Sequence, residues 1–408
     1  MLRAILVFSL MFAGPVLAQE LTPEQAREAE ALMAKGVGLF DRQDYPEAIR
    51  VFLEAREMNP FDVRAPFYLA QCEVNLWMGD QDEARAPRIE EYLEEARRID
   101  EQFGGTYYLI GVFALQLRDY RRALDGFLAA LERGFQVRTA RGNVAWCLFL
   151  WGVSLAGDRN TPIDLPIRVF DDARTRLEAL KDDLRYSQAE REQFRGLWMS
   201  SMVNLVAMHQ KAGNAPRALE ILGILMKLEP DNPLHHYNLG LLQGSQQKSE
   251  EALAAYERAL ELNRDPEWVE PHLRIACIHS LDGKFDRAEH HFDLFFAKHP
   301  DHVEGCFRLA EHYVRKDDPE RVEATYRRCL ELDPLDLRKM YGLGRALIRL
   351  GQDEEAEMWL GLYAALEALQ KEYEVAEAAR TGRIPEFGTH VPSEFGPTKP
   401  YQPVETPK

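Results

Sequence analysis

Residues 303–334 read VEGCFRLAEHYVRKDDPERVEATYRRCLELDP, and this stretch decides the fold. Its apolar residues recur at helical spacing, and it ends in Glu331-Leu332-Asp333-Pro334. The preceding segment ends in Ala297-Lys298-His299-Pro300, so the two prolines lie 34 residues apart. Proline ends a helix because it lacks an N–H group and clashes with the preceding turn. The stretch therefore predicts a helical unit that repeats along the chain.

The same pattern occurs elsewhere in the sequence. Residues 43–49 (QDYPEAI) match residues 117–124 (LRDYRRAL), and Pro60 and Pro230 end similar amphipathic segments. Self-similarity at a fixed period indicates a repeat architecture, and this one resembles the tetratricopeptide repeat, a 34-residue helix-turn-helix unit. The clearest units begin at Ala29, Gly104, Met199, Pro233, Val269, Val303 and Leu337.

The resemblance places small residues where two helices touch, at repeat positions 8 and 20, and a large apolar residue at position 24. Antiparallel helices approach closely only where a small residue sits at the crossing, and the large side chain fills the space beside it. One pair cannot bury its apolar face alone, so successive pairs stack and share a core. The residues are Gly36, Gly111, Val206, Gly240, Ala276, Ala310 and Gly344 at position 8; Ala48, Ala123, Ala218, Ala252, Ala288, Val322 and Ala356 at position 20; and Phe52, Phe127, Leu222, Tyr256, Phe292, Tyr326 and Leu360 at position 24.

The resemblance implies an all-α, right-handed superhelical solenoid of antiparallel helix pairs. It has about nine units, of which two are degenerate, and a C-terminal capping helix from about Glu354 to Arg380. One degenerate unit begins near Val63 and has an insertion around Asp82–Arg88; the other begins near Arg138. The expected segments are a signal peptide (1–18), an N-terminal arm (19–137), a degenerate repeat and joint (138–198), a C-terminal arm with the capping helix (199–381), and a proline-rich disordered tail (382–408).

The first 18 residues have the features of a secretory signal peptide. Arg3 precedes an apolar run from Ala4 to Phe12, and small residues precede Gln19. We therefore expect a periplasmic or extracellular product without an integral membrane segment. Cleavage would remove Arg3 and change the net charge from −17 to −18. A chain this acidic is not expected to bind nucleic acid.

The five cysteines leave two interpretations open. An exported compartment permits disulfides, but the count is odd and no C-x-x-C motif occurs. Buried thiols that behave as small apolar residues are the first expectation. One bridge among Cys277, Cys306 and Cys329 is the alternative.

No established catalytic motif stands out. Gly152-x-Ser154-x-Ala156 differs from a nucleophile elbow, and Gly36-x-Gly38 and Gly342-x-Gly344 lack the third glycine of a nucleotide-binding loop. Nine of the eleven histidines fall within residues 235–312, which raises the question of a metal site. Several of these histidines occupy repeat positions that normally hold core aromatics, so we expect no catalytic residues, no metal and no cofactor.

In the family that this sequence resembles, the first helix of each pair lines a concave groove. Position 6 carries Asn or Arg through four successive units, and aromatic residues at position 5 lie beside them. Arginine suits carboxylates, and asparagine can bind a peptide backbone. Ordinary surface pairing is the alternative, because Glu270 and Glu304 precede Arg274 and Arg308 by four residues. The candidate peptide-binding residues are Asn204, Tyr237, Asn238, Arg274, Phe307, Arg308, Arg315, Arg338, Tyr341, Arg345 and Arg349.

These residues favour a non-catalytic scaffold or adaptor that holds a peptide or helix of an envelope protein, and the arginines favour a partner with acidic segments. Recognition of a chaperone tail is not supported, because Val203, Ala207 and Glu270 replace residues that grip a terminal carboxylate in some members of the family. The alternative is a structural assembly factor of an outer-membrane, secretion, pilus or cytochrome-maturation complex. Such a factor would dock through its convex face or its tail.

Overall fold

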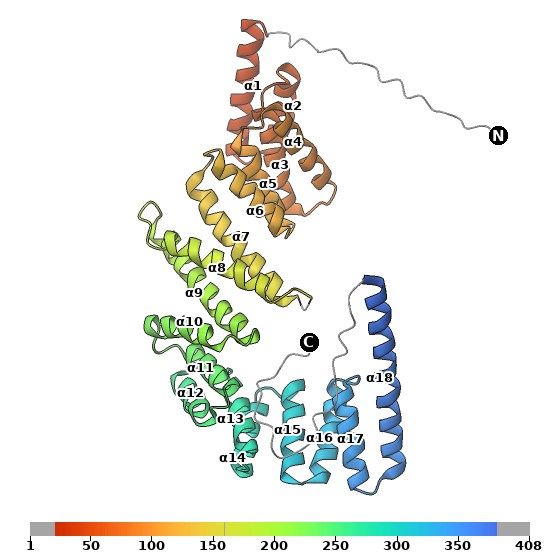
Figure 1. Ribbon diagram of the computed structural model, residues 1–408. Coiled ribbons are helices and arrows are strands. Elements are labelled where there is room, and N and C mark those ends of the chain that lie inside the picture. The colour runs from red at the N-terminus through yellow and green to blue at the C-terminus, as the bar shows by residue number, and fades with distance from the viewer. Residues whose placement is uncertain (1–20, 159, 382–408) are drawn as a thin grey trace, which may run out of the picture. The chain divides into compact units, whose positions relative to one another are not determined.

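The computed structural model describes residues 21–158 and 160–381, and this part of the chain is helical throughout, with eighteen α-helices and no strand (Figure 1). Consecutive helices form antiparallel pairs joined by short turns, which confirms the predicted all-α solenoid of helix pairs. The predicted signal peptide and the predicted proline-rich tail lie outside the described residues. The chain divides into two compact units, which we describe separately.

Unit 1 comprises the residues up to Gly152 together with Asp172–Trp198. Its first six helices are α1 (Pro23–Asp41), α2 (Tyr45–Met58), α3 (Arg64–Asp80), α4 (Arg85–Ile99), α5 (Gly104–Gln116) and α6 (Tyr120–Glu132). The insertion expected around residues 82–88 does not form a long loop, because α4 already begins at Arg85. Successive first helices of the pairs touch one another, since α1 contacts α3 and α3 contacts α5.

Three helices contribute residues to both units. They are α7 (Val137–Gly157), α8 (Asp164–Leu180) and α9 (Gln188–Lys211). A capping box precedes α9: the backbone N–H of Glu190 donates to Ser187 Oγ, and the N–H of Ser187 donates to the Glu190 carboxylate. The chain passes between the two units after Gly152, Asp171 and Trp198.

Unit 2 comprises Val153–Asp171 and the residues from Met199 onward. Its remaining helices are α10 (Ala215–Leu228), α11 (Pro233–Ser245), α12 (Ser249–Leu262), α13 (Glu270–Leu281), α14 (Phe285–Phe296), α15 (Val303–Lys316), α16 (Pro319–Leu332), α17 (Leu337–Arg349) and α18 (Asp353–Thr381). Each second helix from α10 to α16 contacts the first helix of the next pair, so the pairs stack in chain order. The helix expected from Glu354 to Arg380 is α18, which packs on α17.

Local sequence explains the short turns within the pairs. Gly213, Gly283 and Gly351 have φ angles of +73°, +71° and +71°, a conformation that glycine adopts without steric cost. The following helix often begins at a capping side chain: Asn214 accepts from the N–H of Arg217, and Asp318 accepts from the N–H of Arg321. Each pair thus turns sharply, and its two helices lie antiparallel.

The predicted packing of small against large residues holds the pairs together. A Cβ atom added to Gly240 would lie 2.5 Å from the ring of Tyr256, and one added to Gly36 would lie 2.4 Å from Phe52. The rings of Tyr256 and Phe52 are fully buried. The close approach of the two helices therefore depends on the missing side chain at position 8.

Candidate protein-binding site

The candidate binding residues lie on the first helices of the pairs in unit 2. Contact between α13 and α15 shows that successive first helices lie side by side, so α11, α13, α15 and α17 present one face, which we call the A-helix face. Asn204 is on α9; Tyr237 and Asn238 are on α11; Arg274 is on α13; Phe307, Arg308 and Arg315 are on α15; and Arg338, Tyr341, Arg345 and Arg349 are on α17.

The structure brings Tyr237 and Arg274 together. Arg274 Nε donates to Tyr237 Oη over 3.3 Å, and the Tyr237 ring packs edge-on against Trp268 with 5.7 Å between ring centroids. Both side chains are half-buried, so their polar atoms are fixed in place while part of each surface faces solvent. This pair links α11 to α13 at one wall of a pocket.

The pocket on the A-helix face has a volume of about 300 Å³. Its lining residues are Tyr237, Glu270, Leu273, Arg274, Phe295, His299, His302 and Glu304. Two buried atoms, Glu270 Oε2 and His299 Nε2, form no hydrogen bond among the described residues, although His299 Nε2 lies 3.8 Å from Glu270 Oε1. Buried polar groups normally have partners, so these atoms mark a place where a ligand can supply hydrogen bonds.

Six of the eight lining residues are absent from the candidate set, and four of these six are polar. Glu270 and Glu304 were interpreted only as helix-pairing acids, and His299 and His302 only as members of the histidine-rich segment 235–312. His302 precedes α15, and its Nδ1 accepts from the N–H of Gly305 over 2.8 Å, so it also caps that helix. A signal was available in the sequence, because the turn between α14 and α15 carries two histidines close to the start of a first helix.

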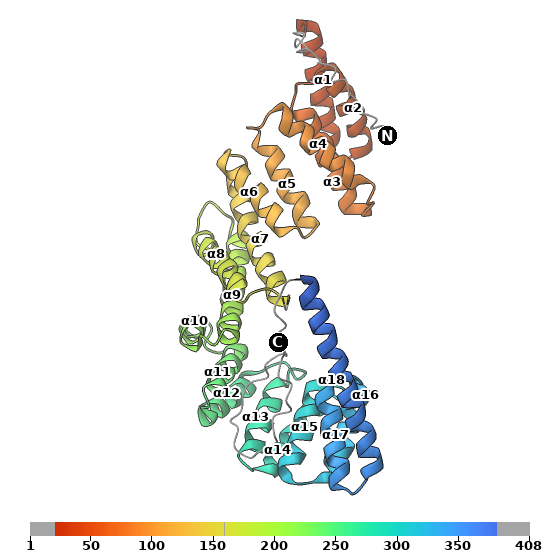
Figure 2. The same cartoon turned by 45° about the vertical axis from the view of Figure 1, so that its right-hand side comes forward.

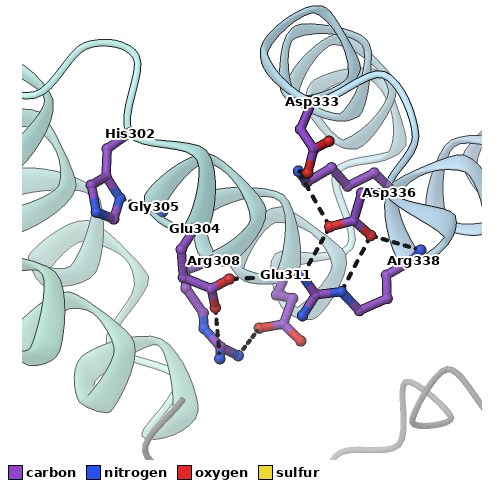
Figure 3. Close-up of polar contacts among 9 residues, drawn as sticks. His302, Glu304, Gly305, Arg308, Glu311, Asp333, Asp336 and Arg338 are labelled. Atoms are coloured by element: carbon purple, nitrogen blue, oxygen red, sulfur yellow. Dashed lines mark hydrogen bonds and ion pairs between the residues drawn. The ribbon is translucent and has the colours of Figure 1, made fainter. Parts of the chain in front are cut away.

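The central arginine of the A-helix face, Arg308, is bound by two acids (Figure 3). Its guanidinium lies 2.9 Å from Glu304 and 2.8 Å from Glu311. Burial acts against the charge of Arg308, but the two carboxylates outweigh burial and raise its pKa. Arg308 is therefore already neutralised within its own helix, as the alternative interpretation of the sequence expected.

Arg338 is paired as well, although no acid precedes it by four residues. Its Nη2 donates to Asp336 Oδ2 over 2.8 Å (Figure 3). The guanidinium also lies over the Phe307 ring. Burial would raise the pKa of Asp336, but Arg338 and the fully buried Lys339 outweigh burial and lower it. Lys339 Nζ lies 3.0 Å from Asp333 and 3.3 Å from Asp336. This cluster is an internal network that fixes α17 against α15.

The remaining polar candidates differ in their surroundings. Arg349 forms an ion pair with Asp317, which lies 32 residues earlier in the chain. Asn204 donates to the carbonyl of Ser200 in its own helix over 2.8 Å, and Asn238 is half-buried on α11. Arg315 and Arg345 are exposed, and Arg345 Nη1 lies 3.5 Å from Tyr341 Oη. Arg315 and Arg345 are thus the more accessible cations of this face.

The histidine-rich segment forms a cluster that the sequence did not predict. His272 Nδ1 and His291 Nδ1 share a hydrogen bond of 2.9 Å between α13 and α14, and the ring of His279 lies 5.8 Å from that of His291. Burial, followed by the neighbouring His272, His279 and His290, lowers the pKa of His291 to about 4. Within residues 21–158 and 160–381 no group of three or more His, Cys, Asp or Glu residues is arranged to hold a metal ion.

The cysteines follow the alternative rather than the first expectation. Cys306 on α15 and Cys329 on α16 form a disulfide, with 5.6 Å between their Cα atoms. The expectation that all five remain thiols is therefore wrong for these two, because the helix pairing brings residues 23 positions apart within bridging distance. Cys72, Cys147 and Cys277 are buried thiols, and burial raises the pKa of Cys72 and Cys147 to about 12.

Stacked helix pairs with small–large contacts define a helical-repeat protein. Within that class, the chain contains tetratricopeptide repeats: family models described as tetratricopeptide repeat match residues 25–98, 233–266 and 306–339. These segments include α11 and most of α15, which carry Tyr237 and Arg308.

Known proteins resemble parts of the chain. Hsp70-Hsp90 organizing protein 3 of Arabidopsis thaliana is 30% identical over 104 residues, which are 26% of this chain and only 17% of that relative. A tetratricopeptide repeat protein from Parabacteroides merdae ATCC 43184 is 15% identical, with a TM-score of 0.47 over 64% of this chain and 93% of that one. MamA from Desulfovibrio magneticus RS-1 is 17% identical, with a TM-score of 0.38 over 42% and 96% of the two chains.

In residues 21–158 and 160–381, no helix is both long and apolar enough to cross a membrane.

Proposed function

We propose that this protein is a non-catalytic scaffold that holds a segment of another protein on the A-helix face of unit 2. The pocket beside Tyr237 and Arg274 carries this proposal, because it combines apolar walls with buried polar atoms that form no hydrogen bond among the described residues. Tetratricopeptide repeats and a relative named as an organizing protein support a protein-binding role. Anchoring aromatic groups and fixed polar groups are what a peptide segment requires.

The pocket offers groups of both charges. Arg274 can donate to a carboxylate or a backbone carbonyl, whereas Glu270 and Glu304 can accept from an amide or a cationic side chain. Arg315 and Arg345 add exposed positive charge along the same face. We infer a bound segment that has mixed polarity at the pocket and acidic residues near Arg315 and Arg345.

We also propose that the protein acts outside the cytoplasm, in a periplasm or an extracellular space. The signal-like residues 1–18 and the Cys306–Cys329 disulfide support this location, because disulfides persist in oxidising compartments. Cell fractionation with thiol labelling tests it. Recovery of the full-length chain from the cytoplasm with five reduced thiols would contradict the export proposal.

Partner capture tests the binding face. A photo-crosslinking residue at position 237 should capture a protein partner, and the same residue at the exposed Arg328 on α16 probes the second-helix surface for comparison. Changing Tyr237 and Arg274 together to Ala should weaken recovery of that partner at least tenfold. Unchanged recovery by a folded double variant would rule out this pocket.

An assembly factor that docks through the second helices is the other candidate. A second hollow of about 440 Å³ favours it, with Phe296, Leu309, Ala324 and Arg328 among its lining residues. Preferential crosslinking at position 328 rather than 237 would support this candidate over the first.

A further inference from the structure

The last described helix, α18, carries an apolar stripe that no other described helix covers. Met358, Leu362, Leu369 and Tyr373 are 57%, 42%, 60% and 69% exposed. Their spacing of four, seven and four residues places them along one side of the helix. Solitary exposed apolar residues are ordinary, but a continuous stripe of them indicates an interaction surface.

A neighbouring stripe of the same helix is already used by the fold. Trp359, Tyr363 and Leu366 pack against the buried cluster that α16 and α17 share. In both views α18 continues past the end of α17 (Figures 1 and 2). The exposed stripe is therefore separate from the packing that holds α18 in place.

The position of α18 in the stack indicates what kind of element fits the stripe. The second helices α12, α14 and α16 each pack against the first helix of their own pair and the first helix of the next pair. Helix α18 packs on α17 and forms the Arg327–Glu355 ion pair with α16, and no further helix pair follows it among the described residues. The stripe spans 16 residues, which corresponds to roughly 24 Å of helix at 1.5 Å per residue. A straight apolar stripe of this length matches the face of one helix of about four turns.

Charge identifies the chemistry of the partner. From Asp353 to Ala376, α18 contains seven acidic residues and one basic residue, and that basic residue, Lys371, lies 3.5 Å from Glu367. Glu372 lies beside the stripe by helical geometry. A second copy of this chain would bring two acidic helices together, and that arrangement is repulsive.

We propose that the Met358–Tyr373 stripe of α18 is a docking surface for a basic amphipathic helix of another protein. The apolar side of that helix covers the stripe, and its flanking Lys or Arg residues lie beside the acids of α18. This surface is distinct from the pocket on the A-helix face, so loss of one leaves the other intact.

The test uses the full chain and two synthetic 18-residue helical peptides. Both peptides have leucines along one side; one has lysines on the flanks and the other has glutamates. The basic peptide should bind in fluorescence anisotropy, weaken as salt is raised, and bind at least tenfold more tightly than the acidic one. Equal binding of the two peptides overturns the proposed charge selectivity.

Matched variants locate the binding. The double change Leu369→Glu with Tyr373→Glu should reduce binding of the basic peptide at least tenfold. Ala364→Glu with Val375→Glu adds the same charge at exposed positions on another side of α18, and the expected change is less than twofold. Circular dichroism melting checks that both variants remain folded. Equal loss in the two variants overturns the stripe as the docking surface.

Two further results would assign the stripe to a different occupant. Sedimentation equilibrium that shows a dimer, dissociated by Leu369→Glu with Tyr373→Glu, would assign the stripe to a second copy of the chain. A chain shortened after Thr381 that binds the basic peptide when the full chain does not would assign it to residues 382–408. A monomeric full chain that binds the peptide supports the proposal.

Discussion

The guanidinium of Arg338 lies over the ring of Phe307, with 4.7 Å from its central carbon to the ring centroid. Phe307 is on α15 and Arg338 is on α17, so this cation–π contact joins the first helices of two successive pairs. Asp336 holds the other edge of the guanidinium. Two residues of the candidate binding face, Phe307 and Arg338, therefore help to hold two successive repeats together.

Phe307→Ala should therefore destabilise the α15–α17 region. Phe307 is almost fully buried against Tyr326, and removing such a ring costs about 3 kcal/mol. Hydrogen exchange should report faster opening of α15 and α17. Phe61→Ala, at a largely exposed position in the other unit, should change stability by about 0.5 kcal/mol or less. Equal effects of the two changes would contradict the packing role of Phe307.

Gly240→Ala should force α11 and α12 apart and thereby destabilise their packing. The added Cβ would lie 2.5 Å from the Tyr256 ring, which is fully buried and has little room to move. We expect a loss of about 1–3 kcal/mol in urea unfolding.

Gly223→Ala on α10 provides the control for this change. A Cβ added there meets nothing within 4 Å, so the same substitution should stabilise the helix by about 0.5–1 kcal/mol. If alanine stabilises the protein at both positions, close contact between the helices does not explain why position 8 holds a small residue.

The packing between helices could be predicted because it depends on a local pattern. Gly240 and Tyr256 occupy repeat positions 8 and 24. The same contact between these two positions recurs in the units that begin at Ala29, Gly104 and Leu337, where position 8 is also glycine. The insertion around residues 82–88 was less predictable, because a helix start at Arg85 depends on neighbouring packing rather than on a periodic residue.

The binding face was less predictable than the fold. The candidate residues lie on first helices of the pairs, but the sequence analysis considered ion-pair partners only four residues upstream. Arg338 pairs with Asp336 two residues earlier, and Arg349 pairs with Asp317 thirty-two residues earlier. Pairing across a solenoid depends on which side chains the stack brings together, and a single repeat does not contain that information.

Breaking the Cys306–Cys329 disulfide should destabilise the region around α15 and α16. The bridge joins residues 23 positions apart, and loss of a loop constraint of this size costs about 3 kcal/mol. Reduction of the wild type should lower its unfolding midpoint, whereas a Cys306→Ala, Cys329→Ala variant should not respond to reductant. Thiol counting in denaturant should give three free thiols in the oxidised chain; five would contradict the disulfide.

Unit 2 should lose stability as the pH falls from about 6.5 towards 4, and His291 should contribute to that loss. Its pKa is lowered to about 4 from an ordinary value near 6.5, so between these values the unfolded chain binds a proton that the folded chain does not. Unfolding is therefore favoured as the pH falls through this window, and the stability is fully present above it.

His291→Gln should reduce this pH dependence, because glutamine can still hydrogen-bond to His272 but does not titrate. Unfolding midpoints measured between pH 5 and pH 7 should therefore change less steeply in this variant than in the wild type. His236→Gln is the matched control, since the His236 ring contacts the carbonyl of Pro230 outside the cluster. If stability depends on pH equally steeply in the two variants, His291 does not contribute to the acid sensitivity of unit 2.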